Sequence, residues 1–99
     1  MDKLKLKTFA LVLESELSSA AAQSKEVAAF AEYEPLVTAI GRAKAEEITE
    51  PYELPGMRYW LFETNISDYK SLDEALARFR LLLSGWDITA DGKIVPPVH

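Results

Sequence analysis

The chain has 99 residues, of which 48% are hydrophobic and 10% aromatic, so we expect one folded domain covering residues 1–99. It contains no cysteine, which excludes disulfides, thiolate metal sites and thiol catalysis. Its net charge of −5 at pH 7 disfavours binding to nucleic acid or to anionic lipid.

Residues 4–22 are predicted to form an amphipathic helix, because their apolar side chains recur three or four positions apart. These side chains are Leu6, Phe9, Leu13, Leu17 and Ala20. Three lysines, Lys3, Lys5 and Lys7, fall in the first turn, where the helix dipole disfavours positive charge. We therefore expect this helix start to fray, or its lysines to make contacts outside the helix.

The basic start followed by an apolar stretch has the outline of a signal peptide. However, Glu14 and Glu16 interrupt the apolar stretch, and no small-residue cleavage site follows. No run approaches the ~20 apolar residues needed to span a bilayer. The expectation is a soluble cytoplasmic protein without a membrane segment.

Two shorter helices are expected next. Ser24 is a suitable N-cap for the first of them. Pro35 disfavours a helical conformation at the residue before it and suits the first position of the second helix, which is predicted to continue to Ile48. Leu36, Ile40, Ala43 and Glu47 would share one stripe of that helix. Residues 49–56 are expected to form a loop, because they contain two prolines and a terminal glycine.

The stretch MRYWLFETN, residues 57–65, contains an apolar run too short to classify by periodicity. Its aromatic content favours a buried strand at residues 58–63, with a short helix as the alternative. We expect Trp60 and Phe62, together with Trp86 further along the chain, to point into the core.

Ser71 and Glu74 match a capping box, Ser-x-x-Glu, and predict the start of the clearest helix of the chain. The apolar residues that share one face of this helix are Leu72, Ala75, Leu76, Phe79, Leu82, Leu83 and Trp86. Gly85 is expected to end the helix in a left-handed conformation.

Residues 86–95, WDITADGKIV, place Asp87, Thr89 and Asp91 on positions 1, 3 and 5 of a calcium-binding EF-hand loop. Loop position 12 has to supply a bidentate carboxylate, but in this chain it is Val98. The prolines at residues 96 and 97 also prevent the second helix of an EF-hand. A hairpin accounts for more of the residues, with Gly92 at the left-handed position of its turn. We expect a hairpin and no metal.

Glu46, Glu47 and Glu50 would lie on one face if the helix continued through them, as in hydrolases that bind Mg²⁺ with paired carboxylates. A solvated acidic helix end explains the same residues. The one histidine, His99, is terminal, and the usual nucleophile–base pairs are absent from the sequence. We therefore expect no enzymatic activity and no cofactor, with a small Mg²⁺-dependent hydrolase as an alternative.

Residues 26–53 carry seven glutamates against Arg42 and Lys44, and this excess equals the whole net charge of −5. Tyr33 and Tyr52 each stand between acids, in EYEP and EPYELP, and are expected to present aromatic faces rimmed by carboxylates. Such faces bind Arg and Lys side chains. The predicted partner-binding residues are Glu32, Tyr33, Glu34, Glu46, Glu47, Glu50, Tyr52 and Glu53.

The expected fold is mainly α, a bundle of three to four helices with a short C-terminal β-hairpin, and α+β only if residues 58–63 form a strand. Short, acidic and cysteine-free, the chain is similar in composition to bacterial immunity proteins that neutralise toxins. This profile favours an inhibitor or immunity-type protein that binds a basic partner, for example a nuclease or another toxin domain. An oligomerising assembly subunit, including a homodimer, is the other alternative.

Overall fold

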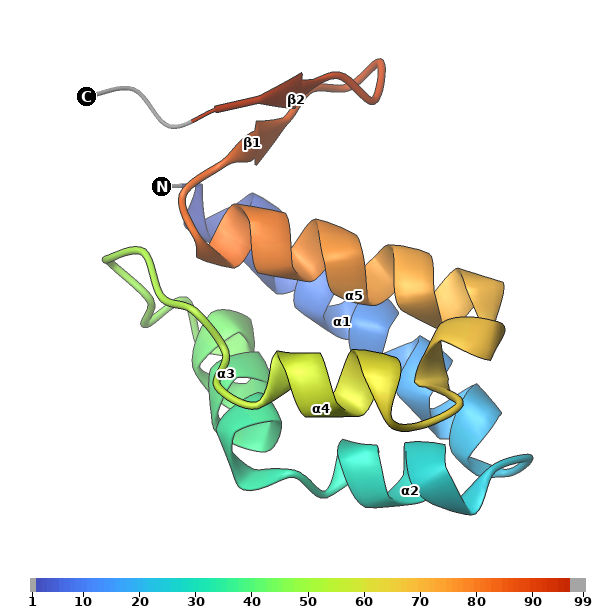
Figure 1. The fold of residues 1–99 in the computed structure, drawn as a ribbon. Coiled ribbons are helices and arrows are strands. Elements are labelled where there is room, and N and C mark those ends of the chain that lie inside the picture. The colour runs from blue at the N-terminus through green and yellow to red at the C-terminus, as the bar shows by residue number, and fades with distance from the viewer. Residues whose placement is uncertain (1, 97–99) are drawn as a thin grey trace.

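Helix α1 (Lys3–Ala21) occupies the centre of the molecule and packs against three other helices. The computed structural model describes residues 2–96. After α1 come α2 (Lys25–Ala31), α3 (Glu34–Lys44), α4 (Met57–Phe62), the 3₁₀ helix η1 (Ile66–Asp68), α5 (Lys70–Leu83), β1 (Asp87–Ile88) and β2 (Ile94–Val95). Figure 1 shows α5 beside α1, with α2, α3 and α4 grouped on one side of this pair and the hairpin on the other. The expected mainly α fold is confirmed.

The core lies where α1 meets α2, α3 and α5. Five buried residues of α1 recur three or four positions apart: Leu6, Ala10, Leu13, Leu17 and Ala20. They meet the buried face of α5, in which Phe79 and Leu83 are completely covered. Because each fully buried large apolar side chain contributes about 1.5–3 kcal/mol, this contact is the main source of stability. None of the helices within residues 2–96 is long and apolar enough to cross a bilayer.

Helix α2 begins at the N-cap predicted from the sequence. The Ser24 hydroxyl accepts a hydrogen bond from the backbone N–H of Val27 at 3.3 Å. It also donates to Oδ1 of Asn65, 2.9 Å away, in the segment that follows α4. In the same segment the backbone N–H of Asn65 donates to the carboxylate of Glu26 at 2.5 Å. The start of α2 is therefore fastened to the connection between α4 and η1.

Helix α3 ends earlier than predicted. Leu36, Ile40 and Ala43 are buried as expected, but the helix stops at Lys44 and does not continue to Ile48. Glu46 adopts a left-handed conformation with φ of 58°, which turns the chain out of the helix.

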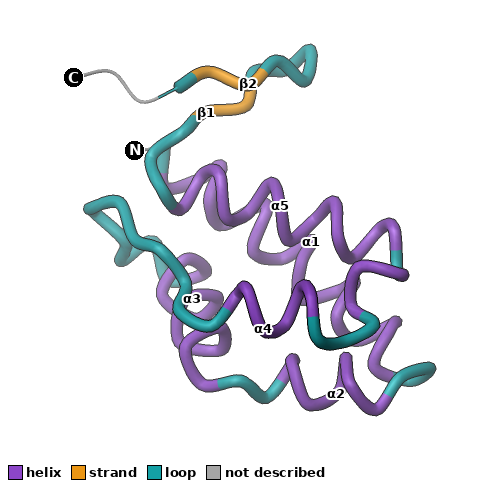
Figure 2. Tube along the Cα trace, in the orientation of Figure 1, coloured by secondary structure: helices purple, strands orange, loops and turns teal. Residues whose placement is uncertain are grey.

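Residues 58–63 belong to a helix, so the preference for a strand is wrong. Gly56, with φ of 74°, precedes α4, and Met57 and Trp60 then face inward three residues apart. The Trp60 ring contacts Phe30 and Tyr33 at centroid distances of 5.1 and 5.4 Å, so α4 is bound to α2 and to the start of α3. Figure 2 shows how little of the trace is strand.

Two of the aromatic residues expected in the core lie at the surface. Phe62 is 78% exposed and Trp86 is 37% exposed, whereas Trp60 is partly buried against the core. In α4 the helical period places Phe62 on the face opposite Met57, and Trp86 follows the last turn of α5.

Helix α5 begins one residue before Ser71, and the predicted capping box is not formed. Its N-cap is Tyr69, which makes no side-chain cap, and Ser71 is exposed. The preceding 3₁₀ turn sets this start, because the backbone N–H of Tyr69 donates to the carbonyl of Ile66. Glu74 instead bonds Arg78 one turn further along. The predicted end at Gly85 is confirmed by its φ of 98°.

The hairpin of β1 and β2 is also confirmed. Asp87 pairs with Val95, and Gly92 occupies the left-handed turn position with φ of 86°. Lys5 holds the hairpin on α1, because its Nζ donates to Asp87 at 2.7 Å and to the carbonyl of Ile88 at 3.0 Å. The first-turn lysine thus makes a contact outside its helix, as one of the two expectations stated. Val98 and His99 lie outside the described residues.

Candidate partner-binding surface

The acidic segment folds back on itself. After α3, residues 45–56 return along this helix to its beginning, where the Tyr33 hydroxyl donates to the carbonyl of Pro55 at 2.9 Å. We call residues 45–56 the return loop. This bond places the end of the loop beside the residue that precedes α3, so the loop ends where the helix begins.

The return loop is fixed at four points. Ile48 and Leu54 are buried, with exposed fractions of 4% and 7%. The backbone N–H of Tyr52 donates to the carbonyl of Leu83 at the end of α5, 2.9 Å away, and the Tyr33 hydroxyl closes the loop at Pro55. Between these points residues 49–53 are exposed. Their backbone is held while their side chains remain available.

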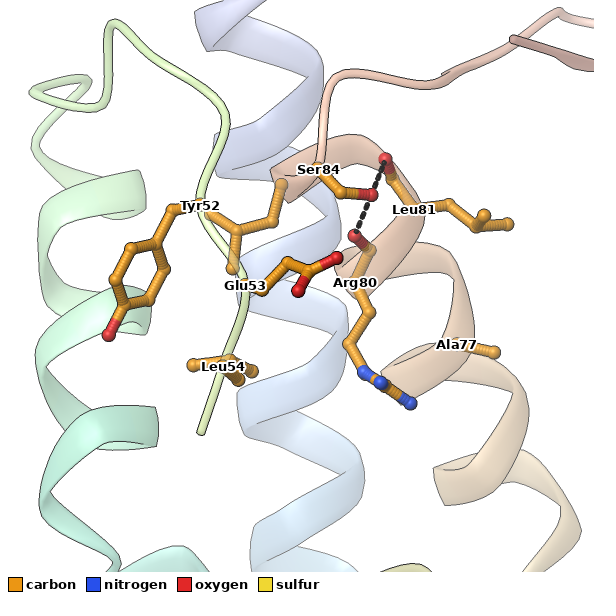
Figure 3. Close-up of a pocket in the computed structure, with 8 residues that line it drawn as sticks. Tyr52, Glu53, Leu54, Ala77, Arg80, Leu81 and Ser84 are labelled. Atoms are coloured by element: carbon orange, nitrogen blue, oxygen red, sulfur yellow. Dashed lines mark hydrogen bonds between the residues drawn. The ribbon is translucent and has the colours of Figure 1, made fainter. Parts of the chain in front are cut away.

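Tyr52 separates two hollows in this surface. The larger, of about 420 Å³, lies between the return loop and α5 and is lined by Glu53, Leu54 and Arg80, among others. The smaller, of about 200 Å³, lies between the loop and α3, with Arg42 and Glu50 in its lining. In Figure 3 the Tyr52 ring points away from α5, whereas the Glu53 side chain extends toward it.

Most acids of residues 26–53 form no ion pair with another residue of the described chain. Glu46 lies 3.9 Å from Nζ of Lys7, and Glu26 binds a backbone N–H. The remaining five glutamates form no ion pair within residues 2–96: Glu32, Glu34, Glu47, Glu50 and Glu53. All five are exposed, and we refer to them as the acidic surface. Their negative field is therefore directed into solvent.

The two predicted tyrosines are placed differently. Tyr52 is 42% exposed, in keeping with the expected aromatic face. Tyr33 is half-buried, packs on Trp60 and uses its hydroxyl within the chain, so its expected open face is not observed. A Cβ added at Gly56 would lie 2.5 Å from the Tyr33 hydroxyl oxygen and 3.2 Å from the nearest ring carbon, so this tyrosine packs closely on the end of the return loop.

The metal alternatives lose their geometric basis. Glu46 and Glu50 do not share a helix face, because α3 ends at Lys44. No three or more His, Cys, Asp or Glu residues of the described chain are grouped as a metal would require. In the hairpin, Lys5 binds Asp87 and lowers the pKa of that carboxyl, and the Thr89 hydroxyl does the same to the pKa of Asp91. Both carboxylates already have partners.

Sequence reasoning missed the two arginines of this surface. Arg42 and Arg80 each line one of the hollows beside a glutamate, so the neighbourhood of Tyr52 carries both signs of charge. Arg42 lies within the acidic segment and was counted only as a reduction of its charge. Arg80 is brought there by the packing of the return loop on α5, for which the sequence contains no local signal.

Comparison with family models, curated proteins and solved structures gives no significant match to this chain.

Proposed function

We propose that this chain is a small protein-binding module of the inhibitor or immunity type, whose acidic surface engages a basic partner. The observation that carries the proposal is the return loop. Its backbone is anchored at several points, yet Glu50, Tyr52 and Glu53 stay exposed, and neither glutamate forms an ion pair with a residue of 2–96. Because the backbone that carries these charges and the aromatic side chain is already fixed, binding a partner loses little conformational entropy.

Each part of the surface has a role in this proposal. The five glutamates attract a basic partner over a distance of roughly one Debye length, about 8–10 Å, and accelerate the encounter. Tyr52 then becomes covered and holds the complex, as aromatic anchors do. Arg42 and Arg80 donate to acceptors of the partner beside Tyr52 and so fix its orientation. A nuclease or similar basic toxin domain fits this description, because an acidic loop can occupy the site of an anionic substrate.

Two variants of equal net charge test the proposal. The first replaces Glu32, Glu34, Glu50 and Glu53 with Gln. The control replaces four acids outside the segment, Glu16→Gln, Asp68→Asn, Asp73→Asn and Glu74→Gln. A basic protein retained by the parent and the control, but lost with the first variant, supports the proposal. An acidic partner, or equal retention by all three proteins, contradicts it.

Binding kinetics with the recovered partner separate steering from anchoring. The Glu→Gln set should lower the association rate about tenfold at low salt and leave dissociation nearly unchanged. Tyr52→Ala should instead accelerate dissociation by one to two orders of magnitude, roughly the effect of losing an interface hot spot. Tyr33→Phe removes the bond to Pro55, and by loosening the loop it should give a smaller effect of the same kind.

A further inference from the structure

Helix α4 presents an aromatic surface that nothing in the described chain covers. Phe62 is 78% exposed and is the most exposed large apolar side chain of residues 2–96. Tyr59, beside it, is 57% exposed. With Arg58 and Glu63 they line one open hollow of about 470 Å³. This face is separate from the return loop, and the inference below does not depend on the proposed function.

The four residues share one face of the helix. Arg58 and Phe62 are four positions apart, as are Tyr59 and Glu63, and the backbone N–H of Glu63 still donates to Tyr59 at 2.8 Å. The aromatic pair therefore lies in the middle of the face, with Arg58 on one flank and Glu63 on the other. Trp60 holds the helix from behind through its contacts with Phe30 and Tyr33.

The charges on this face are reversed from what the helix itself favours. A cation near the N-terminus and an anion at the C-cap both oppose the helix dipole. Arg58 is the second residue of α4 and Glu63 is its C-cap, and neither forms an ion pair within the described chain. The stability of α4 itself therefore does not explain this arrangement of charge, which suits a partner of complementary charge.

We propose that the α4 face binds the α4 face of a second copy of this chain. In a two-fold dimer every contact occurs twice. Two copies of α4 that cross at this face place each Arg58 beside the Glu63 of the other copy, with the four aromatic rings between the two ion pairs. The face is thus complementary to itself in charge as well as apolar in its centre.

The area of this face indicates a weak dimer. Because a covered aromatic side chain buries about 150–250 Å², the exposed parts of the two rings offer roughly 250 Å² per copy. A standard interface buries about 800 Å² per partner. We therefore expect reversible, concentration-dependent dimerisation in the micromolar range or weaker, which high salt diminishes because the ion pairs lie at the rim.

Charge reversal gives the decisive test, with sedimentation equilibrium from micromolar to millimolar protein as the measurement. Arg58→Glu and Glu63→Arg should each weaken self-association at least about tenfold, because two attractive pairs become repulsive. The two single variants mixed together should dimerise like the parent, and so should the double variant. Both reversals improve the charge arrangement along α4, so loss of the helix cannot imitate the result.

Phe62→Ser should weaken the dimer as well, while Leu11→Ser, which changes an exposed leucine of α1, should leave it intact. The proposal is overturned if the parent stays monomeric at millimolar concentration. A dimer that ignores both charge reversals, or one that Leu11→Ser abolishes, would place the interface elsewhere and overturn it equally. Failure of the mixed single variants to associate would do the same. The acidic-surface variants are not involved in any of these measurements.

Discussion

The return loop and the segment after α5 leave their helices with the same backbone bonds but with different residues. The N–H of Glu47 donates to the carbonyl of Arg42, and the N–H of Trp86 to that of Leu81, each at 2.9 Å. Both are Schellman motifs closed by a residue with positive φ. That residue is glycine at position 85 and glutamate at position 46, with φ of 98° and 58°. The backbone hydrogen bonds define where the helix ends, and the residue type determines only the conformational free energy of the positive φ.

The two segments also differ in what holds them. The return loop is held by the buried side chains of Ile48 and Leu54, whereas the hairpin depends more on polar contacts, above all between Lys5 and Asp87. We therefore expect the hairpin to respond to pH and the return loop to respond to loss of apolar volume.

The largest effect should follow from Leu54→Ala. Removing a nearly buried leucine leaves a cavity and should lower the free energy of unfolding by about 3 kcal/mol. Ile94→Ala in the hairpin is the matched control, since Ile94 is 50% exposed, and should cost under about 0.5 kcal/mol. Urea denaturation measures both. Equal effects of the two substitutions would show that the segments are not held in different ways.

Gly85→Ala should be the next most damaging change. An alanine forced into the left-handed conformation costs about 1–2 kcal/mol, because its Cβ crowds the following carbonyl. The denaturation midpoint should fall accordingly, and the amide of Trp86 should exchange faster as its bond to Leu81 weakens. A midpoint equal to that of the parent would mean that α5 ends in another conformation.

Glu46→Gly should act in the opposite direction and stabilise the chain by about 1 kcal/mol, since glycine removes the same strain at the end of α3. Glu46→Gln is the control, because it keeps the strain and removes only the charge that faces Lys7 at 3.9 Å. Both variants are compared with the parent by thermal unfolding. A gain that appears equally in the glutamine variant would have to come from charge and not from the backbone.

The smallest effect concerns acid. The Lys5 hydrogen bond lowers the pKa of Asp87 below its ordinary value of 3.8. This carboxylate therefore contributes stability above pH 3.8, and the contribution is lost as the pH falls through the lower pKa of the folded state. Asp87→Asn should flatten this part of the stability profile and leave the return loop unchanged. Amide shifts of Ile88 and Ile94, followed by NMR between pH 5 and pH 2, report the release of the hairpin, and a profile unaltered in the variant would remove the role assigned to Asp87.

The sequence predicts the elements whose determinants are local. The period of α1 and the face of α5 follow from apolar spacing, and Ser24, Gly85 and Gly92 mark a helix start, a helix end and a turn. Ser71 has the same local signal as Ser24 but does not cap, because the 3₁₀ turn before α5 has already determined where that helix begins. A serine near a helix start therefore indicates an N-cap only when no preceding turn has already determined the first residue of the helix.

The missed features depend on contacts between distant residues. Neither the helical state of α4 nor the early end of α3 has a local signal, since α4 is stabilised by Trp60 on Phe30 and the left-handed Glu46 by burial of the loop behind it. The acids of the candidate surface were visible in the composition. Arg80 was not, because only the return loop places it beside Glu53.

The central position of α1 has a consequence for how the molecule forms. Its buried face is completed by α5, and the ion pair between Lys5 and Asp87 joins residues 82 positions apart. Such a topology has a higher contact order than a bundle in which each helix packs on the next, and folding slows as contact order rises. During synthesis the part of α1 that α5 covers stays exposed until α5 has emerged. This interval is when we expect the chain to be most prone to aggregate or to require a chaperone.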